Sequence, residues 1–438
     1  MDRTDGRAAD ALRVHEIIPD FVPTAAGSCL IRTGETRVIC TASVEEGVPP
    51  FLKGKGEGWL TAEYAMLPAS TGRRKARDGV KKDGRGVEIS RLIGRALRQA
   101  VDRRWLGERT VTIDCDVLTA DGGTRTAAIT GGFTALCLAV DRLIREGKLR
   151  ESPIVHQIAA VSAGIVGDTP CLDLCYTEDS SAQVDMNFIM NERGEYIELQ
   201  GTGEGRAFTG EELAALCALG RKGCGELMAL QREALGRDSL LPQGPHTLAL
   251  ASNNGHKLSE LKEMIGGSMN VLSMREAGFE DEIDENGKTF EENALIKARA
   301  VAKATGLAAL ADDSGLSVDA LNGDPGVHSA RYAGMHGDDA ANNKKLIRNM
   351  QGIPKPWTAK FVCAVALVLP GGKEWVVRGE CPGVIIEEAR GTGGFGYDPH
   401  FLYEELNQTF AEISQEDKNR VSHRAMAMAK MLPIIRGL

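Results

Sequence analysis

The segment LLPQGPHTLALASNNGHKLSELKEMI, from Leu240 to Ile265, has the pattern with which a domain begins. A Pro/Gly-rich break from Pro242 to Pro245 precedes a short apolar run, an Asn-Asn-Gly turn and a helix. This pattern lies past the midpoint of a 438-residue chain, which is too long for one ordinary hydrophobic core. We therefore predict two domains of mixed α/β (α+β) architecture, residues 1–241 and 247–438, joined by a linker at 242–246.

The composition is that of a globular protein without membrane contacts. The chain is 42% hydrophobic and 26% charged, with a net charge of −9. We find no apolar run near the roughly 18 residues of a membrane span, and the charged start MDRTDGRAAD is unlike a signal peptide. The ten cysteines include no CxxC pair, which predicts reduced, mostly buried thiols and a cytoplasmic protein.

The first half mixes strand and helix signals and carries one basic stretch. Two apolar runs flank a turn at 33–35, which indicates a hairpin, and the apolar spacing from Ile89 to Leu97 predicts an amphipathic helix. Residues 73–91 contain eight basic and three acidic residues, although each half of the chain is weakly acidic. Any nucleic-acid contact is therefore expected at this local patch.

A glycine turn in the first half could bind phosphate. Gly122 and Gly123 precede Thr124 and Arg125 at the start of a helix, where free amides and a guanidinium favour an oxyanion. Arg85, within the basic stretch, could add a second guanidinium. A simple turn and a solvated loop are the structural alternatives.

Two carboxylates in the first half could bind a divalent metal. Asp179 and Asp185 flank a short connection that enters the strand VDMNFIM. Carboxylates near an anion site suit a cation that neutralises phosphate charge. Two surface acids in a loop are the alternative.

Together these residues lie in motifs that resemble ribonuclease PH. The motifs GWLTAEYAMLP, VEISRLIGRALR, IDCDVLTADGGTRTAAITG, EDSSAQVDMNFIM and IELQGTGEGRAFT follow that family's order over nearly all of residues 1–240. The resemblance implies the ribosomal-S5-like β-α fold, a hexameric ring, and phosphate-dependent 3′→5′ trimming of tRNA precursors that releases nucleoside diphosphates. Inorganic phosphate is then a co-substrate, and the basic stretch would follow the RNA backbone.

The resemblance also assigns residues to this site. The implied phosphate-binding residues are Arg85, Gly123, Thr124 and Arg125. The implied metal ligands are Asp179 and Asp185, which are also catalytic. Gly86 stands where the family usually has threonine, so we expect a more flexible loop beside Arg85.

The second half opens with a candidate triphosphate site. HTLALAS lacks alternation, which is typical of a buried parallel strand, and the loop and helix of SNNGHKLSELKEMI follow it. Backbone amides with Asn253, Asn254 and Lys257 could hold phosphates there, although the Walker pattern is absent.

An acidic strand end follows. Thr289 and Glu292 predict a capping box for a helix. LAALADDSGLSVDAL then predicts an apolar strand that ends in a loop containing Asp312 and Asp313. Adjacent carboxylates require a cation, for which Mg²⁺ is the obvious candidate, or form an ordinary polar turn.

Two further segments could recognise a base. In RGTGGFGYDPHF, glycines surround Phe395 and Tyr397, either of which could stack on a base. EDKNRVSHRAMA places Lys418, His423 and Arg424 at the start of the last helix, either in contact with a nucleotide or simply solvated.

The motifs LALASNNGHKLSEL, GKTFEENALIKA, ADDSGLSVDALNGDPGVHSARYAG, GTGGFGYDPHF and EDKNRVSHRA together resemble the inosine triphosphate pyrophosphatases, over about residues 246–436. The resemblance implies a mixed α/β fold with a second lobe, a dimer, and Mg²⁺-dependent hydrolysis of ITP, dITP and XTP to monophosphate and pyrophosphate. The implied substrate-binding residues are Ser252, Asn253, Asn254, Gly255, His256, Lys257, Ser314, Phe395, Gly396, Tyr397, Asp398, Lys418, His423 and Arg424.

The resemblance makes Asp313 a metal ligand and the catalytic base. A second metal carboxylate is expected at Glu285, with Asp284 or Glu292 as alternatives. Donors to the purine 6-oxo group would be left unpaired by the 6-amino group of ATP, which would give selectivity.

The combined hypothesis is a bifunctional, homo-oligomeric enzyme that acts on RNA 3′ ends and on purine nucleoside triphosphates. Its rival is an RNA-binding scaffold with an inactive phosphorolytic site that carries an active pyrophosphatase. For the second half alone, the rival is a nucleotide-binding regulatory module.

Overall fold

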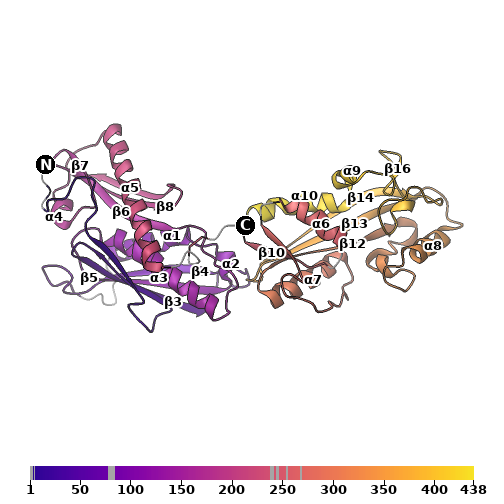
Figure 1. The fold of residues 1–438 in the computed structure, drawn as a ribbon, viewed down its shortest axis with the longest axis horizontal. Helices are drawn as coiled ribbons and strands as arrows, with labels where there is room; N and C mark the ends of the chain where they lie inside the picture. Colours follow the sequence, from indigo (N-terminus) through magenta and orange to yellow (C-terminus); the bar gives the residue numbers. More distant parts are fainter. Residues whose placement is uncertain are drawn as a thin grey trace. The chain divides into compact units, whose positions relative to one another are not determined.

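The computed structural model describes residues 3, 5–76, 84–236, 241–242, 246–252, 255–266 and 269–438, without the side chains of 255–257, 260, 415, 416 and 419. The chain divides into two compact units, Met1–Gly244 and Pro245–Leu438. Each unit has its own sheets and its own hydrophobic clusters (Figure 1).

The first unit contains strands and helices in a mixed order. They are β1 (His15–Pro19), β2 (Gly27–Thr33), β3 (Thr36–Glu46), β4 (Trp59–Met66), α1 (Gly84–Arg98), α2 (Arg103–Leu106), β5 (Arg109–Thr119), α3 (Thr124–Arg145), β6 (Ile158–Val166), β7 (Thr169–Leu172), α4 (Tyr176–Asp179), β8 (Val184–Asn191), β9 (Tyr196–Gly203) and α5 (Gly210–Leu235).

Helix α3 is the centre of the first unit because it packs between two sheets. One sheet has the order β1-β2-β3-β5-β4 and the other β7-β6-β8-β9, and α3 contacts β2, β3 and β6. Gly131 of α3 lies against Ile31 and Cys40, where a Cβ would be 2.8 Å from each side chain. Helix α1 covers β4, and α5 covers β6. The predicted hairpin at 33–35 and the predicted helix through Leu97 are both confirmed.

One helix has the overall composition of a membrane span, although it contains no uninterrupted apolar run of about 18 residues. Among the described residues, Thr124–Arg145 is long and apolar enough to cross a membrane, but 89% of its apolar window is buried inside the protein. The apolar residues cover the whole circumference of α3 because sheets pack on two of its sides. The composition of α3 therefore reflects its position in the core.

The second unit is built on one larger sheet. Its elements are β10 (Thr247–Leu250), α6 (Gly255–Ile265), β11 (Asn270–Ser273), α7 (Phe290–Thr305), β12 (Ala308–Val318), η3 (Asp319–Leu321), η4 (Gly326–Arg331), α8 (Asp339–Met350), β13 (Trp357–Val368), β14 (Glu374–Ile385), η5 (Asp398–His400), β15 (Phe401–Tyr403), β16 (Gln408–Thr409), α9 (Gln415–Val421) and α10 (His423–Arg436).

This sheet has the order β11-β10-β12-β13-β14-β15-β16. Strand β10 is parallel to β11 and β12, as its apolar run predicted, whereas the remaining pairs are antiparallel. Helix α7 packs on one face of β13, and α10 packs on the other face, against β14 (Figure 1). The aspartates of β12 therefore lie between two helical layers.

The ten cysteines are all free, and nine of them are buried. Cys217 on α5 is half-buried. The prediction that the thiols are mostly buried is confirmed.

Candidate functional sites

A glycine turn begins helix α3 and lies against the chain that enters α4. Gly122 and Gly123 have φ angles of 73° and 65°, in the left-handed region that favours glycine. A Cβ on Gly122 would lie 2.6 Å from the carbonyl oxygen of Leu174, so the two backbones are in direct contact. The Thr124 hydroxyl accepts a hydrogen bond from Tyr64 at 2.9 Å. The turn therefore has the local structure that the sequence predicts.

Arg85 and Arg125 come from different helices, α1 and α3, and both influence the pKa of Tyr64. Arg125 Nη1 donates to Gln200 Oε1 at 3.1 Å and lies 4.0 Å from Glu88. Burial raises the pKa of Tyr64, and the nearby guanidinium groups of Arg85 and Arg125 partly counteract that rise. Both arginines therefore act on Tyr64, whose hydroxyl bonds to Thr124 of the glycine turn.

The basic stretch 73–91 is only partly described, since residues 77–83 lie outside the described residues. Gly86 lies in the first turn of α1. The expectation of a flexible loop beside Arg85 is therefore wrong, because helical backbone geometry constrains the residue that follows it.

Asp179, at the end of α4, and Asp185, in β8, interact with each other. Burial and then repulsion by Asp179 raise the pKa of Asp185 to about 6, against the attraction of Arg125. Burial also raises the pKa of Asp179, and Glu204 contributes to both shifts. Sequence reasoning missed Glu204, although it lies within the motif IELQGTGEGRAFT.

These neighbouring carboxylates fit a divalent cation, because a cation would relieve their burial and mutual repulsion. No group of three or more His, Cys, Asp or Glu residues in the described part of the chain has the arrangement of a metal site.

Buried arginines near the N-terminus hold the segment that carries α4. Arg3 Nη2 lies 2.6 Å from Glu178 Oε2, and Arg13 Nη2 lies 2.6 Å from Asp173 Oδ1. Burial alone would raise the pKa of Asp173, but hydrogen bonds with His15 and Arg13 hold it well below its usual range. Sequence reasoning missed this network, because its partners are about 160 residues or more apart.

Strand β12 carries two aspartates that point to opposite sides of the sheet. Asp312 and Asp313 lie in the middle of Ala308–Val318, paired throughout with β13. The predicted loop is therefore wrong, and strand alternation separates the two side chains. Asp312 is buried and accepts from Arg424 Nη2 at 3.4 Å, whereas Asp313 accepts from Asn293 Nδ2 at 3.1 Å.

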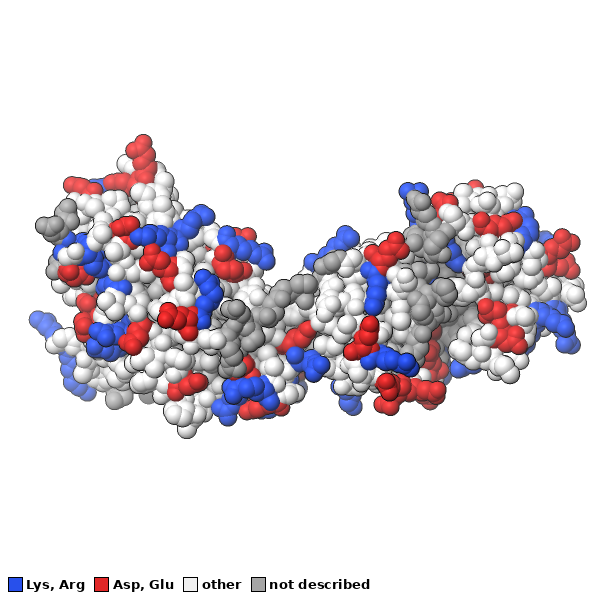
Figure 2. Space-filling view, viewed as in Figure 1, with Lys and Arg blue, Asp and Glu red and all other residues white. Residues whose placement is uncertain are grey.

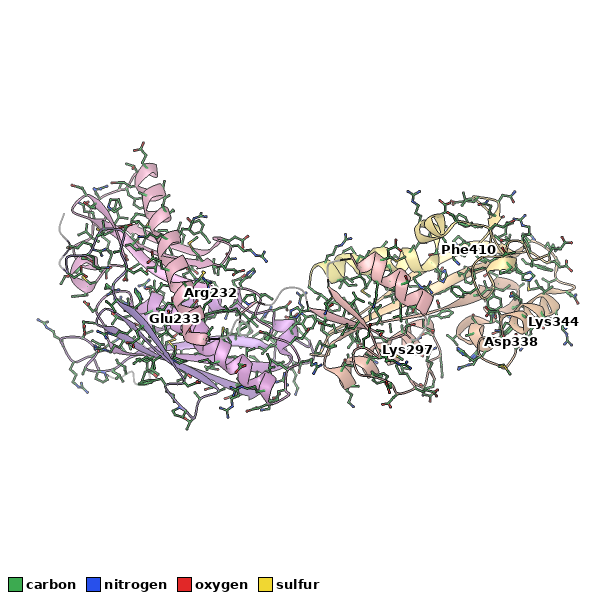
Figure 3. The ribbon with its side chains drawn as sticks, in the orientation of Figure 1. Arg232, Glu233, Lys297, Asp338, Lys344 and Phe410 are labelled. Carbon is green, nitrogen blue, oxygen red and sulfur yellow. The ribbon has the colours of Figure 1, made fainter. Side chains whose placement is uncertain are left out.

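Lys297, on α7 (Figure 3), lies between two carboxylates. Its Nζ is 3.1 Å from Glu285 Oε2 and 3.4 Å from Asp313 Oδ1. Burial opposes the charge, but Asp313, Asp312 and Glu285 together raise the pKa of Lys297, so the ammonium persists at neutral pH. Two carboxylates that share one ammonium are donors of the kind Mg²⁺ prefers. Sequence reasoning missed Lys297, which lies in the motif GKTFEENALIKA.

Of the three acids considered for the second metal position, Glu285 is the one beside this ammonium. Glu292 Oε2 accepts from the amide of Lys288 at 2.6 Å, and Thr289 Oγ1 accepts from the amide of Glu292 at 3.1 Å. Glu292 therefore stabilises the start of α7. The predicted capping box is half formed, because Glu292 reaches the amide of Lys288 instead of that of Thr289. Asp284 is exposed.

The segment predicted to hold a triphosphate follows β10. The amide of Ala251 donates to Leu310 at 2.8 Å, so Ser252 lies beside the part of β12 that carries the aspartates. Asn253 and Asn254 lie outside the described residues. The backbone of Gly255, His256 and Lys257 begins α6, and their side chains also lie outside the described residues.

The two aromatic residues of the glycine-rich segment have different environments. Phe395 is 45% exposed, and Lys418 Nζ lies 5.2 Å from the centre of its ring. Tyr397 is only 4% exposed, and its hydroxyl donates to the carbonyl of Ser329 at 2.8 Å. Of the two residues expected to stack on a base, the accessible one is Phe395.

Asp398 holds this segment through two hydrogen bonds. Its Oδ2 accepts from the amide of Phe395 at 2.9 Å and from Lys418 Nζ at 2.6 Å. On the other side, the amide of Gly396 donates to Asp339 at 2.7 Å. Lys418 lies on the separate helix α9, whereas the sequence predicted it on the last helix.

His423 and Arg424 begin α10, and both are buried, so the solvated alternative for this helix start is wrong. The ring of His423 stacks on Phe361, with centres 5.0 Å apart and planes 16° apart. Arg424 pairs with Asp312, with Nη2 and Oδ2 3.4 Å apart. Ser314 follows in β12.

Residues 11–140 and 156–223 match domains 1 and 2 of the 3′ exoribonuclease family, and residues 248–434 match the Ham1 family. Over 231 residues the chain is 56% identical to ribonuclease PH of Neisseria gonorrhoeae, which covers 52% of this chain and 96% of that protein.

Two solved structures are similar to the second unit. The Ham1 protein of Staphylococcus aureus is 39% identical and covers 44% of this chain and 98% of its own, with a TM-score of 0.42. The nucleoside-triphosphatase (dITP/XTP pyrophosphatase) of Mycobacterium abscessus is 47% identical and covers 43% of this chain and 99% of its own, with a TM-score of 0.39.

The protein is therefore a two-domain fusion of an RNA-processing fold and a nucleotide-processing fold, with acidic residues gathered in each. Its first unit belongs to the 3′ exoribonuclease family, as a ribonuclease PH domain, and its second unit belongs to the Ham1 family. The family resemblance predicted from the sequence motifs is confirmed for both halves.

Proposed function

We propose that the chain is bifunctional, and that its first unit removes nucleotides from the 3′ ends of tRNA precursors with inorganic phosphate. A phosphate oxygen attacks the last phosphodiester, the bond to the preceding 3′ oxygen breaks, and a nucleoside diphosphate leaves. The observation that carries this proposal is the hydrogen bond from Tyr64 to Thr124 of the glycine turn, together with the action of both Arg85 and Arg125 on Tyr64.

In this reaction, positioning and charge matter more than a strong base. Arg85 and Arg125 hold the attacking phosphate, and the amides at the start of α3 and the Thr124 hydroxyl orient it. Asp179 and Asp185 would hold Mg²⁺, which when bound neutralises charge on the phosphates.

We further propose that the second unit hydrolyses ITP, dITP and XTP to the nucleoside monophosphate and pyrophosphate. Asp313 orients a water molecule for attack on the α-phosphorus, and Phe395 stacks on the purine. Glu285 and Asp313 would hold Mg²⁺, which when bound polarises the phosphate oxygens. The supporting observation is the grouping of Glu285, Lys297 and Asp313 in one cluster.

We propose that the protein is cytoplasmic and forms a homo-oligomer. The first unit would form a hexameric ring, and the second unit would form dimer contacts. The buried, free thiols agree with a reducing compartment. Light scattering of the purified chain measures the subunit number directly, and the mass of a single chain would contradict the ring.

The first activity is tested with a tRNA precursor that has a 3′ extension, with and without phosphate. We expect diphosphates that require phosphate and fall at least 100-fold for Arg125→Ala. Arg145→Ala is the matched control, because Arg145 is an exposed arginine at the other end of α3. If the wild type binds the precursor with its 3′ extension but releases no diphosphate, the scaffold alternative is favoured.

The second activity is tested by pyrophosphate release from dITP and from ATP. We expect Mg²⁺-dependent release from dITP, strong discrimination against ATP, and a large loss for Asp313→Asn. The exposed Asp281→Asn is the control. Nucleotide binding without turnover in the wild type would indicate a regulatory module instead.

A further inference from the structure

An exposed aromatic side chain stands in the loop 47–58, outside both sites described above. Phe51 is 58% exposed, yet its ring packs edge-on against Trp59, with centres 5.4 Å apart and planes at 87°. The loop is held by the buried Leu52, whose carbonyl accepts from the amide of Lys55 at 3.0 Å, and by a bond from Gly58 to the carbonyl of Arg103 at 2.8 Å. Phe51 is therefore a fixed and accessible aromatic surface.

The support beneath this surface is cationic. The Arg98 guanidinium lies 4.8 Å from the centre of the Trp59 ring, and its Nη1 donates to the carbonyl of Leu60 at 3.0 Å. Phe51, Trp59 and Arg98 thus form one cluster, in which the outermost ring, Phe51, is 58% exposed. This arrangement resembles the base-stacking platforms of proteins that bind single-stranded nucleic acid.

Arginines of α1 lie between this cluster and the phosphate residues. Arg85, Arg91, Arg95 and Arg98 follow one another along α1, with Arg95 paired to Glu198 at 2.7 Å, and α1 packs antiparallel to β4. Two hydrogen bonds fix this direction, because Ser90 accepts from the amide of Tyr64 and Arg98 donates to Leu60. From Arg85 to Arg98 the helix rises about 20 Å, at ~1.5 Å per residue.

The loop carries two lysines, and the carboxylate of Glu108 accepts from the amide of Gly56 in the same loop at 3.2 Å. Lys53 and Lys55 are exposed, and neither lies within 4 Å of a carboxylate of the described chain. The nearest acid in the sequence, Glu57, pairs with Arg103 at 3.3 Å. Elsewhere on the visible face of this unit, positive and negative side chains are interspersed (Figure 2).

We propose that Phe51 is a stacking platform for single-stranded RNA upstream of the 3′ end. With the terminal phosphodiester at Arg85 and Arg125, the strand runs along α1 past Arg91 and Arg98, and one base stacks on Phe51. Lys53 and Lys55 contact the phosphates on either side. At ~3.4 Å per stacked nucleotide, about 20 Å corresponds to roughly six nucleotides. The platform therefore engages long unpaired tails and not short ones.

This proposal rests on the proposed function of the first unit, and its test needs no turnover. The full-length protein is titrated, without phosphate, into fluorescein-labelled oligoadenylates of 12 and of 4 nucleotides, and Kd is read from anisotropy. We expect Phe51→Ala to weaken binding of the 12-mer about ten-fold and that of the 4-mer less than two-fold. Phe51→Trp should restore binding of the 12-mer.

Phe21→Ala is the matched control, since Phe21 is 43% exposed and follows β1, at the opposite edge of the sheet from β4. Lys53→Ala combined with Lys55→Ala supplies a second test that does not disturb the ring. For this double variant, the slope of log Kd against log salt should fall by about 1.4 for the 12-mer, at ~0.7 per phosphate contact.

Equal effects of Phe51→Ala on both lengths, or no effect on either, would overturn the proposal. A lower molar mass of Phe51→Ala in light scattering would also overturn it, because Phe51 would then be a contact between copies of the chain. If the wild type shows phosphorolysis but Phe51→Ala affects both RNA lengths equally, only the stacking platform is contradicted. If Phe51→Ala weakens binding of the 12-mer alone but the wild type shows no phosphorolysis, only the proposed reaction is contradicted.

Discussion

The Lys418 ammonium lies 2.6 Å from the Asp398 carboxylate, and both side chains are buried. Burial raises the pKa of Asp398, and Lys418 opposes that rise. The pair joins α9 to the glycine-rich segment and places the carboxylate below the amide of Phe395. A buried charge is costly without its partner, so the conformation of this segment depends on the pair.

Two glycines of this segment allow a matched test of that dependence. Gly394 and Gly396 both have positive φ, at 74° and 62°, so an alanine costs about 1–2 kcal/mol of strain at each. Only at Gly394 would the new Cβ also collide with the Asp398 carboxylate. We expect Gly394→Ala to raise KM for dITP at least ten-fold and Gly396→Ala only a few-fold. Similar values for the two variants in steady-state kinetics would contradict this explanation.

Phe395 and Tyr397 should respond differently to small changes. Phe395→Ala removes the accessible ring, and we expect an increased KM for dITP with little change in melting temperature. Tyr397→Phe leaves the carbonyl of Ser329 without its buried donor, which costs about 1–3 kcal/mol of stability. Calorimetry measures the melting temperature of each variant, and steady-state kinetics measures its KM. A raised KM for Tyr397→Phe and a lowered melting temperature for Phe395→Ala would assign the base contact to Tyr397.

Lys297 should be needed for the second activity and not for the fold of its unit. Lys297→Met leaves Glu285 and Asp313 facing each other without the ammonium. We expect kcat/KM for dITP to fall at least 100-fold, with circular dichroism unchanged. Lys297→Arg keeps the charge and should retain more activity. Full activity of the methionine variant would show that the ammonium has no role.

The buried Asp173 should make the first unit acid-sensitive. Its folded-state pKa lies well below the unfolded value of about 3.9, so its stabilisation is complete above that pH and decreases as pH falls below it. Asp173→Asn leaves Arg13 buried without its partner, and we expect a loss of about 3–5 kcal/mol at pH 7.

The measurement for Asp173 is peptide-resolved hydrogen exchange of β6 and β8. At pH 7 the variant should exchange faster, and the difference from the wild type should shrink toward pH 3. Asp168→Asn is the control, because Asp168 is an exposed residue in the turn between β6 and β7. A difference that grows on acidification would contradict the depressed pKa of Asp173.

Local patterns predicted the elements better than they predicted the neighbours of each residue. The hairpin at 33–35, the helix through Leu97 and the buried strand β10 follow from turn residues and apolar spacing. The loop expected at Asp312 failed because β13, about 50 residues later, extends the pairing of β12 to Val318. Pairing of this kind depends on a distant segment, and no local pattern reveals it.

The same distinction applies to the candidate sites. The motifs contain Asp313 and Arg125, whose residue types and glycine neighbours suggest chemistry by themselves. Lys297, Glu204 and Arg3 look like ordinary charged residues until the fold brings them to carboxylates on other elements. Their roles depend on tertiary contacts, and only the structure could reveal them.

The distribution of thiols makes the chain its own reporter of unfolding. Cys217 is the half-buried thiol of the first unit, whereas both cysteines of the second unit, Cys363 and Cys381, are buried in its sheet. A thiol-reactive dye should therefore modify Cys217 first in the native protein. Later modification of Cys363 and Cys381 would report the opening of the Ham1 unit alone, without any engineered label.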